Sequence, residues 1–492
     1  MGDFRKKIKV ASREPMLDYA DFNLRIGRGI GDLHKIDVNT RFSEHVPLAI
    51  PIAGAAMEFD EHAMAIALAM AGGIGVIHRN NTPEQQLEEV QQVKKHEAFV
   101  IRDAKTITPD KTVAEAQEVM KRHENGHMSN LSLPVIESVS RKVVGMLTER
   151  DVDAVDDPKQ TTVEQAMTKG DKLVTARYDI TEKEAYDMMR HARVKKLLLL
   201  DQQGLYYGLV VKKDVLSRLH NPQAIRDSEG RLRVAAAIGS RDVRRVKLLD
   251  PWVDAFVVDQ ASFYTEADPS EVVKLFEHTK KDIVIGNFGT KEGVLDCMRI
   301  VDRAAGVKGG IGGGAACSTQ ETTGVGVPAP EAVLRIREAF KEVGRSVPVG
   351  GDGGVKIGRN IAQLLAMGAD YAMCGYVFAG TTESAAPRAE GGGKEYRGMG
   401  SAGARQKRIE LGIGDTRYPD RNGNGLVEGQ TVRVERSGSA SEVIEDLVRA
   451  TKKSMDYTGA RNIEDMHRKV GIELVRTRTQ KPWQEQALMR RG

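Results

Sequence analysis

The stretch Val347-Pro-Val-Gly-Gly-Asp-Gly-Gly-Val-Lys-Ile-Gly-Arg-Asn-Ile-Ala-Gln-Leu-Leu-Ala-Met-Gly-Ala-Asp-Tyr-Ala-Met-Cys-Gly375 decides the fold. The apolar run Val347–Gly351 ends in glycines, an amphipathic segment follows at Asn360–Met367, and a second apolar run occupies Tyr371–Gly375. Short apolar runs joined by a segment of helical period are typical of parallel strands with a crossover helix. The stretch therefore predicts one strand–helix–strand unit of an α/β fold.

The same alternation continues in both directions, with amphipathic segments at Glu61–Ala71 and Ala329–Val343. The predicted strands are Pro47–Ala55, Gly72–His78, Leu232–Gly239, Ala255–Asp259, Asp282–Asn287, Val307–Gly312, Val347–Gly351 and Tyr371–Gly375. Eight strands favour a (β/α)8 TIM barrel, and a doubly wound open sheet remains the alternative. In such a barrel the chemistry is expected at the carboxyl ends of the strands.

An internal repeat interrupts this series between about Phe99 and His220. Helix, strand, turn, strand and helix patterns occur twice in the same order, once up to Asp151-Val and once up to Asp214-Val. We therefore expect a barrel built from residues 1–97 and 221–492, with the repeat at 98–220 inserted as a separate domain.

The repeat resembles a pair of cystathionine-β-synthase (CBS) motifs, a module that commonly binds adenine or guanine nucleotides. The resemblance implies that Thr148 and Asp151 of the first copy, and Lys212 and Asp214 of the second, contact ribose and phosphate. Val211 stands where the second motif usually has Ser or Thr. A module that only packs, without a ligand, is therefore the alternative.

Composition excludes several classes of protein. A net charge of +4 among 73 basic and 69 acidic residues, with no long basic block, predicts no nucleic-acid partner. The longest apolar run, Ala63–Ala71, is too short for a membrane span, and the first residues lack the apolar core of a signal peptide. Three cysteines make no disulfide framework, so we expect a cytoplasmic protein.

The stretch that carries the chemistry is Val307-Lys-Gly-Gly-Ile-Gly-Gly-Gly-Ala-Ala-Cys317-Ser-Thr-Gln-Glu-Thr-Thr-Gly-Val-Gly-Val-Pro328. A predicted strand enters a glycine loop whose backbone can face a phosphate or a monovalent cation. Cys317 follows at the carboxyl end of that strand, where a thiolate can attack an electrophilic ring carbon. We expect the other two cysteines, Cys297 and Cys374, to be small buried hydrophobic residues.

This loop resembles the active-site loop of the inosine monophosphate dehydrogenase (IMP dehydrogenase) and GMP reductase family. Segments along nearly the whole chain match the same family. They are Gly351-Asp-Gly-Gly354 (ribose), Met373-Cys-Gly-Tyr376 and the following Val-Phe-Ala-Gly380 (phosphate), Glu395-Tyr-Arg-Gly-Met-Gly-Ser401 (base), and the closing segments Glu428-Gly429, Ser437-Gly438 and Tyr457-Thr-Gly-Ala460.

The resemblance implies roles for single residues. Cys317 is the nucleophile that adds to purine C2, Thr319 positions water, and Arg417 and Tyr418 are the arginine–tyrosine pair of a mobile flap. Asp259, Asn287, Gly310 and Gly312 would face NAD, and the carbonyls of Gly312, Gly314 and Cys317 would hold K⁺. The expected substrate-binding residues are Asp352, Gly353, Gly354, Gly375, Tyr376, Tyr396, Gly398, Met399, Gly400 and Glu428.

The chain departs from the family where phosphate is bound. The serines of the family would fall near Ala55 and at Ala315 and Tyr376, and none is retained. Each lost hydroxyl removes a charge-assisted hydrogen bond of roughly 1.5–3 kcal/mol. Phosphate is therefore held differently here, or the natural ligand differs.

Three functions follow from the resemblance. The first is an NAD-dependent, K⁺-activated oxidation of IMP to xanthosine monophosphate in guanine nucleotide biosynthesis. The second is a reductase acting on GMP or another purine; the long interval from Met399 to Glu428, and Ala402-Gly-Ala404 in place of a glutamate, favour the dehydrogenase. The third is a paralogue that binds or senses nucleotides without dehydrogenase activity. The family forms homotetramers, often paired into octamers.

Overall fold

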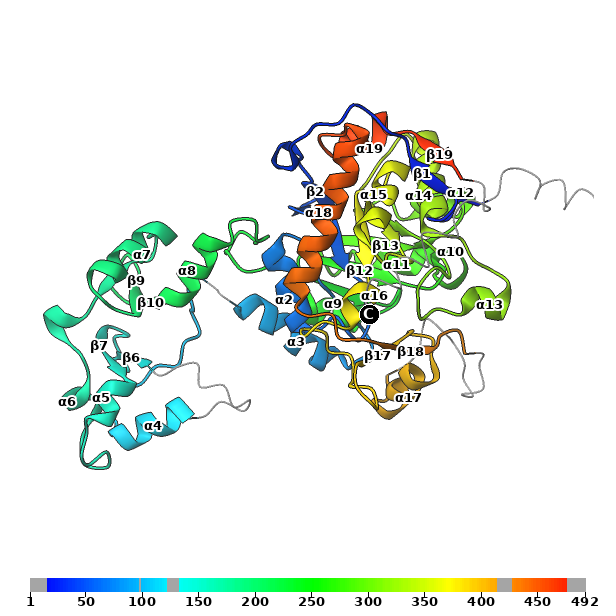
Figure 1. Cartoon of the computed structure of the whole chain (residues 1–492). Helices are drawn as coiled ribbons and strands as arrows, with labels where there is room; N and C mark the ends of the chain where they lie inside the picture. Colours follow the sequence, from blue (N-terminus) through cyan, green and yellow to red (C-terminus); the bar gives the residue numbers. More distant parts are fainter. Residues whose placement is uncertain (1–15, 97–98, 122–131, 414–426, 476–492) are drawn as a thin grey trace, which may run out of the picture. The chain divides into compact units, whose positions relative to one another are not determined.

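The computed structural model describes residues 16–96, 99–121, 132–413 and 427–475. The chain divides into two compact units (Figure 1). The first comprises Met1–Lys94, Gln223–Asp227 and Leu232–Gly492, and the second comprises Lys95–Pro222 and Ser228–Arg231. Among the described residues, no helix combines the length and apolar character that a membrane crossing requires.

The first unit is built on one sheet of eight strands. In sheet order they are β4 (Ile52–Gly54), β16 (Tyr371–Cys374), β15 (Val349–Asp352), β14 (Gly306–Gly309), β13 (Asp282–Phe288), β12 (Ala255–Asp259), β11 (Ala235–Ile238) and β5 (Val76–Ile77). All neighbouring strands pair in parallel. A parallel bridge between Ala53 and Ile74 joins the β4 edge to the segment just before β5, which closes the barrel. The TIM-barrel prediction is therefore confirmed.

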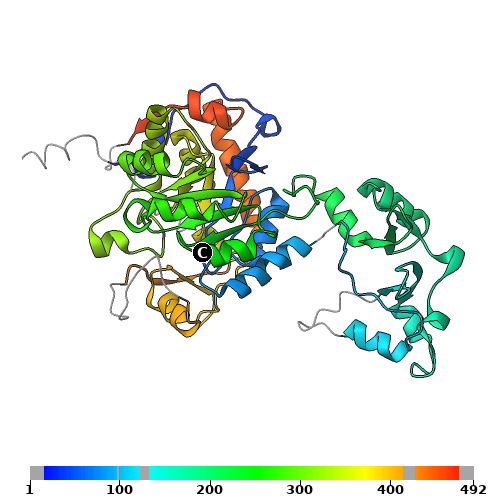
Figure 2. The same cartoon turned by 180° about the vertical axis from the view of Figure 1, so that it is seen from behind.

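Helices surround the strands (Figures 1 and 2). They are α2 (His62–Ala71), α3 (Pro83–Lys95), α9 (Val243–Leu249), α10 (Phe263–Glu266), α11 (Pro269–Leu275), α12 (Lys291–Ile300), α14 (Ala329–Val343), α15 (Gly358–Met367), α18 (Ala440–Thr458) and α19 (Ile463–Lys469). The helix α14 begins and ends where the sequence predicts. The helix α18 packs on α15 so closely that a Cβ at Gly358 would lie 2.5 Å from the Leu447 carbonyl oxygen.

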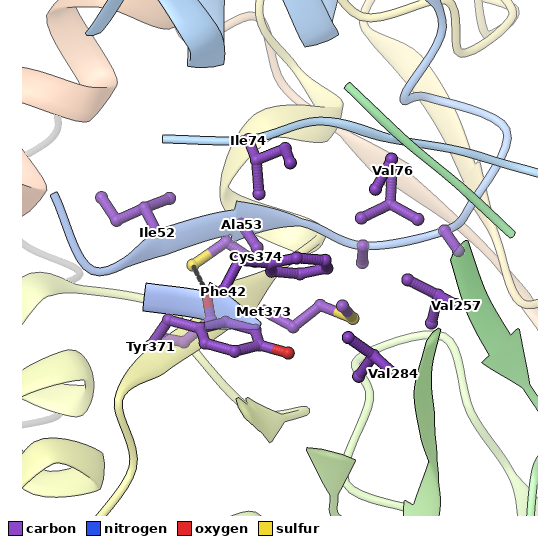
Figure 3. Close-up of a cluster of buried hydrophobic side chains, with 14 of the residues drawn as sticks. Phe42, Ile52, Ala53, Ile74, Val76, Val257, Val284, Tyr371, Met373 and Cys374 are labelled. Atoms are coloured by element: carbon purple, nitrogen blue, oxygen red, sulfur yellow. Dashed lines mark hydrogen bonds between the residues drawn. The ribbon is translucent and has the colours of Figure 1, made fainter. Parts of the chain in front are cut away.

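A hairpin of β2 (Thr40–Ser43) and β3 (Val46–Leu48) covers the amino-terminal end of the barrel. Phe42 of this hairpin packs on Tyr371 at the start of β16, with ring centroids 5.0 Å apart, and both side chains are fully buried (Figure 3). The predicted strand Pro47–Ala55 is therefore wrong as one element. It divides into β3 and β4, because the chain bends over residues 49–51 to leave the hairpin for the barrel.

The second unit consists of two similar halves. The first contains α4 (Val113–Lys121), β6 (Ser132–Ile136), β7 (Val143–Thr148), α5 (Glu149–Asp153) and α6 (Val163–Ala166). The second contains β8 (Thr175–Arg177), α7 (Glu182–His191), β9 (Lys196–Leu200), β10 (Tyr206–Val211) and α8 (Lys212–His220). Each half is centred on an antiparallel pair, β6–β7 or β9–β10, with a parallel neighbour at its side. The repeat in the sequence is therefore a repeat in the structure.

Candidate active site

A cavity that opens to solvent lies at the carboxyl ends of the barrel strands. Most of the predicted site residues line it. They are Asp259, Asn287, Gly310, Gly312, Gly314, Cys317, Thr319, Asp352, Gly353, Tyr396, Gly398, Met399, Gly400 and Glu428. A smaller cavity is lined by Gly354, Gly375 and Tyr376, together with Ala55 and Ala315. Asp352, Gly353, Gly314 and Tyr396 line both, so the two cavities adjoin.

The loop after β14 presents Cys317 through backbone pairing on both sides. Ile311 and Val327 exchange two hydrogen bonds of 2.8 Å, which closes the loop at its base. Cys317 pairs with Gly429 in an antiparallel bridge, and the Gln430 amide donates to the Ala316 carbonyl at 3.0 Å. The nucleophile candidate is thus held between its own loop and a segment more than a hundred residues further along the chain.

Thr319 and Glu428 are the side-chain neighbours of Cys317. The sulfur lies 3.2 Å from Thr319 Oγ1, and that hydroxyl donates to Glu428 Oε2 at 3.0 Å. A hydroxyl has one proton, so when it points to Glu428 its lone pairs accept the S–H of Cys317. When the same proton turns toward the sulfur, it stabilises a thiolate. Thr319 lies at the start of the short helix α13 (Thr319–Thr323), which fixes its position two residues from the sulfur.

Asp352, at the end of β15, is held by a lysine that the sequence interpretation did not single out. Lys308 is 1% exposed, and its Nζ donates to Asp259 Oδ1 and to Asp352 Oδ2, both at 2.9 Å. It also donates to Asn287 Oδ1. Because lysine only donates, this contact fixes the orientation of the Asn287 amide, whose Nδ2 then donates to Asp352 Oδ2 at 2.9 Å. The available signal was a lysine within an otherwise apolar strand.

Glycines at two positions allow the loops to approach one another. Gly310 has φ +130°, and a Cβ there would lie 2.0 Å from the Asp352 carbonyl oxygen. Its own carbonyl accepts a hydrogen bond of 2.7 Å from Asn287 Nδ2. A Cβ at Gly375 would lie 2.4 Å from the Tyr396 hydroxyl. Larger residues at either position would push apart the elements that line the cavities.

The hydroxyl of Tyr396 lies 2.9 Å from Met57 Sδ, and burial raises the pKa of Tyr396 well above its ordinary value. Tyr376 meets Tyr396 edge to face, with centroids 6.0 Å apart, and remains 40% exposed. The Tyr376 ring therefore forms part of the wall of the smaller cavity, at the position where the family resemblance implies a serine.

A buried carboxylate, also missed from the sequence, anchors the segment Glu395–Ser401, for which the family resemblance implies base binding. Tyr396 and its neighbours form β17 (Lys394–Arg397), which pairs with β18 (Thr431–Val434) and precedes α17 (Ala402–Glu410). Glu58 is 7% exposed and accepts from Arg397, from Asn80 Nδ2 at 2.7 Å, and from Lys407 Nζ at 3.1 Å. Burial raises its pKa, but these donors outweigh burial and lower the pKa to about 2. No local pattern reveals this contact, because its partners are far apart in sequence.

The other cysteines are buried, as predicted. Cys297 is 1% exposed, and burial raises its pKa to about 12. Cys374 is fully buried, burial raises its pKa further, and its S–H points to the Ala372 carbonyl at 3.8 Å (Figure 3). Neither thiol provides a thiolate near neutral pH.

The loop offers neutral oxygen donors rather than charged metal ligands. Gly312 has φ +80°, and the Gly314 carbonyl accepts a 3.0 Å hydrogen bond from the Cys317 amide. Within the described ranges, no cluster of three His, Cys, Asp or Glu side chains could hold a metal ion. Backbone carbonyl oxygens are the ligands that bind K⁺ in selectivity filters, so this type of donor is compatible with K⁺.

Two further groups of residues were predicted from the sequence. Arg417 and Tyr418 lie outside the described residues. In the second unit, Thr148 and Asp151 form the capping box of α5, with Thr148 Oγ1 donating to Asp151 Oδ2 at 2.7 Å.

The second half lacks the equivalent cap. Val211 precedes α8, and Lys212 Nζ lies 5.6 Å from the Tyr186 ring centroid. Asp214 lies in the first turn of α8, close enough to Lys196 for the two charges to interact.

The sequence of this chain is similar to those of known proteins along most of its length. The profile of the IMP dehydrogenase / GMP reductase domain matches residues 17–486. An inosine-5′-monophosphate dehydrogenase of Methanocaldococcus jannaschii is 38% identical over 454 residues, covering 89% of this chain and 88% of that protein. One of Korarchaeum cryptofilum is 37% identical over 444 residues, covering 89% of this chain and 90% of that protein.

Solved structures also match along nearly the whole chain. A GMP reductase of Trypanosoma brucei with cysteine replaced by alanine, in complex with guanosine 5′-monophosphate, has a TM-score of 0.84 and 29% identity. The match covers 96% of this chain and 98% of that one. The same organism's enzyme in complex with guanosine 5′-triphosphate has a TM-score of 0.75 and 27% identity, covering 95% and 100% of the two chains.

Proposed function

The chain belongs to the IMP dehydrogenase / GMP reductase family, and from this premise we propose that it oxidises IMP to xanthosine monophosphate with NAD. The position of Cys317 carries the proposal: its sulfur lies in the wall of the cavity, 3.2 Å from the Thr319 hydroxyl. The relatives named IMP dehydrogenase support the oxidation of IMP. The product would enter guanine nucleotide biosynthesis in the cytoplasm.

In the proposed mechanism the Cys317 thiolate adds to purine C2, which lets the hydride at C2 leave and forms a thioimidate. Thr319 stabilises the thiolate before attack and positions the water that later replaces sulfur. Arg417 would take the proton from that water, with Tyr418 beside it. Arginine is a weak base at its ordinary pKa, so the flap must close over a dry site for this step.

The nucleotide lies between the ribose and base segments in this proposal. Asp352 accepts the ribose hydroxyls while Gly353 and Gly354 bring the backbone close. Tyr396, Gly398, Met399 and Gly400, with Glu428, face the base, and Gly375 and Tyr376 face the phosphate. Lys356 is the basic side chain among those lining the smaller cavity. We propose that its charge offsets part of what the lost serine hydroxyls would supply.

The cofactors would be held by the same cavity. Asp259 and Asn287 offer a carboxylate and an amide for the nicotinamide riboside, with Gly310 and Gly312 allowing close approach. NAD, when bound, accepts the hydride. The carbonyls of Gly312, Gly314 and Cys317 would hold K⁺, whose charge favours the loop conformation that presents the sulfur. Replacing K⁺ with Li⁺ should then lower turnover while IMP binding without NAD persists.

The test of this function is NADH formation from IMP and NAD, followed at 340 nm with purified full-length protein. Turnover in the wild type and its loss in Cys317→Ala, with unchanged thermal unfolding, would support the proposal. Binding of IMP without any NADH production would contradict it. That result would favour the nucleotide-sensing paralogue.

Reduction of GMP is the second candidate, because the two solved structures described above are GMP reductases. The two reactions can be distinguished in a single assay by what they consume and release. A reductase consumes NADPH and releases ammonia from GMP, whereas a dehydrogenase produces NADH from IMP. Ammonia release in the absence of IMP turnover would favour the reductase.

For the second unit we propose a tandem CBS module at residues 98–220 that binds adenine or guanine nucleotides through Thr148, Asp151, Lys212 and Asp214. The two similar halves support it. Asp151→Ala should abolish thermal stabilisation by one class of purine nucleotides in the full-length protein. Because Asp151 also caps α5, the control is Glu184→Ala, which breaks a capping box of the same kind at α7. Loss of stabilisation in both variants would contradict a binding role.

The homotetramer or octamer expected from the family is tested by mass photometry with and without nucleotide.

A further inference from the structure

Lys308 joins the two carboxylates that the proposed function assigns to different ligands. Asp259 stands at the end of β12, and Asp352 stands at the end of β15. One oxygen of each carboxylate accepts a hydrogen bond from the same ammonium, at 2.9 Å from Nζ in both cases. The two oxygens are therefore at most 5.8 Å apart, the sum of 2.9 and 2.9 Å.

Burial makes this arrangement sensitive to the charge of Lys308. The lysine side chain is 1% exposed, while those of Asp259 and Asp352 are 11% and 21% exposed. Two like charges this close, and only partly exposed to water, repel one another unless a cation lies between them. The Lys308 ammonium and the two carboxylates carry a net charge of −1 among themselves, and Asn287 satisfies further hydrogen bonds without adding charge. The Arg79 guanidinium, a second cation, donates to the Asp259 backbone carbonyl at 3.2 Å.

The Lys308 ammonium also determines how the two carboxylates are oriented. Lys308 and Asn287 both bind Asp352 through Oδ2, so Oδ1 is the oxygen left to accept a ligand hydroxyl. Lys308 likewise engages Oδ1 of Asp259. Since Lys308 lies in β14 and is fully buried, it does not need to touch either ligand to determine how both carboxylates point.

We propose that Lys308 is a positioning residue that holds Asp259 and Asp352 ready to accept the ribose hydroxyls of NAD and of the purine nucleotide. This inference rests on the proposed function, because that function assigns the two riboses to the two carboxylates. It adds that a single buried ammonium orients the carboxylates that accept ribose hydroxyls at both subsites. The sequence analysis did not predict this lysine as a site residue.

The test compares binding of IMP with that of 2′,3′-dideoxyinosine 5′-monophosphate by calorimetry, without NAD, so that turnover plays no part. In the wild type, loss of the ribose hydroxyls should weaken binding by roughly 10- to 100-fold. In Lys308→Met the two ligands should bind within about threefold of each other, and NAD should also bind at least tenfold more weakly. A purely structural role would weaken both inosine ligands equally.

Lys94→Met is the matched control, since Lys94 is equally buried and paired with Asp227 and Asp254 outside the cavities. It should keep the wild-type preference for the hydroxyl-bearing ligand. The variant Asp259→Asn/Lys308→Met restores the net charge of −1. It should therefore regain part of the preference for IMP, while its affinity for NAD remains low. If Lys308→Met does not fold, a cooperative melt regained in the double variant is the same rescue.

Two results would overturn the inference. One is a folded Lys308→Met that retains the full preference for IMP, and the other is a double variant that recovers neither folding nor preference. A wild type that does not distinguish the two inosine ligands would instead refute the ribose site of the proposed function. The inference would fall with it, and that outcome is recognisable because it appears before any substitution is made.

Discussion

Cys317 Sγ and Thr319 Oγ1 lie 3.2 Å apart, and the same hydroxyl donates to Glu428 Oε2. The thiol, the hydroxyl and the carboxylate thus form one chain in the wall of the cavity. Cys317 and Thr319 come from a single loop, whereas Glu428 lies 109 residues after Thr319 in the sequence. Any rearrangement of the Glu428 segment would therefore be transmitted to the candidate nucleophile.

The first prediction concerns this chain of contacts. Thr319→Val keeps the shape of the side chain and removes its hydroxyl, so NADH formation should fall by about 10- to 100-fold with IMP binding retained. Cys317→Ala should lower it by at least about 1,000-fold. Cys297→Ala is the control, because that thiol is buried away from the cavity. Equal activity in Thr319→Val and wild type would show that the hydroxyl takes no part.

The second prediction concerns Glu58, whose pKa of about 2 lies below its ordinary value of 4.5. A carboxylate with a depressed pKa stabilises the fold fully above pH 4.5, and that stability is lost as pH falls toward 2. Glu58→Gln should cost about 3 kcal/mol at neutral pH and remove this acid dependence, measured by urea unfolding. Glu445→Gln, at an exposed position of α18, should change neither quantity. An unaltered acid profile in Glu58→Gln would contradict the assignment.

The third prediction concerns Asp60, whose ionisation makes the protein less stable as pH rises, opposite to the effect of Glu58. Asp60 is fully buried, its Oδ2 accepts from the Val76 amide at 2.9 Å, and burial raises its pKa to about 8. Between pH 3.8 and 8 the folded protein holds a proton that the unfolded chain has lost, so stability falls as pH rises through this window. The slope is about 1.4 kcal/mol per pH unit.

Asp60→Asn removes this titration and should raise the unfolding midpoint at pH 8 more than at pH 5. Urea unfolding at several pH values measures the difference. If wild type and variant showed parallel pH profiles, Asp60 would be ionised in the folded state.

The fourth prediction concerns Tyr376 at the proposed phosphate end. Tyr376→Ser removes the ring that lies against Tyr396 and supplies a small hydroxyl, so the KM for IMP should fall by roughly tenfold. Tyr376→Ala separates the two effects, because it removes the ring without adding a donor. A KM that rises in both variants would mean that the tyrosine itself contributes to binding.

Much of this architecture could be predicted from local sequence. The runs around Ala255 and Val349 are apolar on both faces because barrel strands are covered inside and out, and glycines mark their ends. Helix ends were equally readable: α14 stops at Gly344 in a left-handed conformation that favours glycine. The division of the predicted strand Pro47–Ala55 into β3 and β4 could not be predicted, because both of these parts are apolar.

The sequence by itself determined the order of strands and helices, the repeat, and the loop that carries Cys317, because these depend on periodicity and on residue types close together in the chain. Only the tertiary structure decided that Lys308 lies between Asp259 and Asp352, and that Glu58 anchors Arg397. Parallel strands bring their carboxyl ends together at distances in sequence that no local pattern encodes. A buried charge is retained only where those distant partners meet it, so its role becomes visible once the barrel is closed.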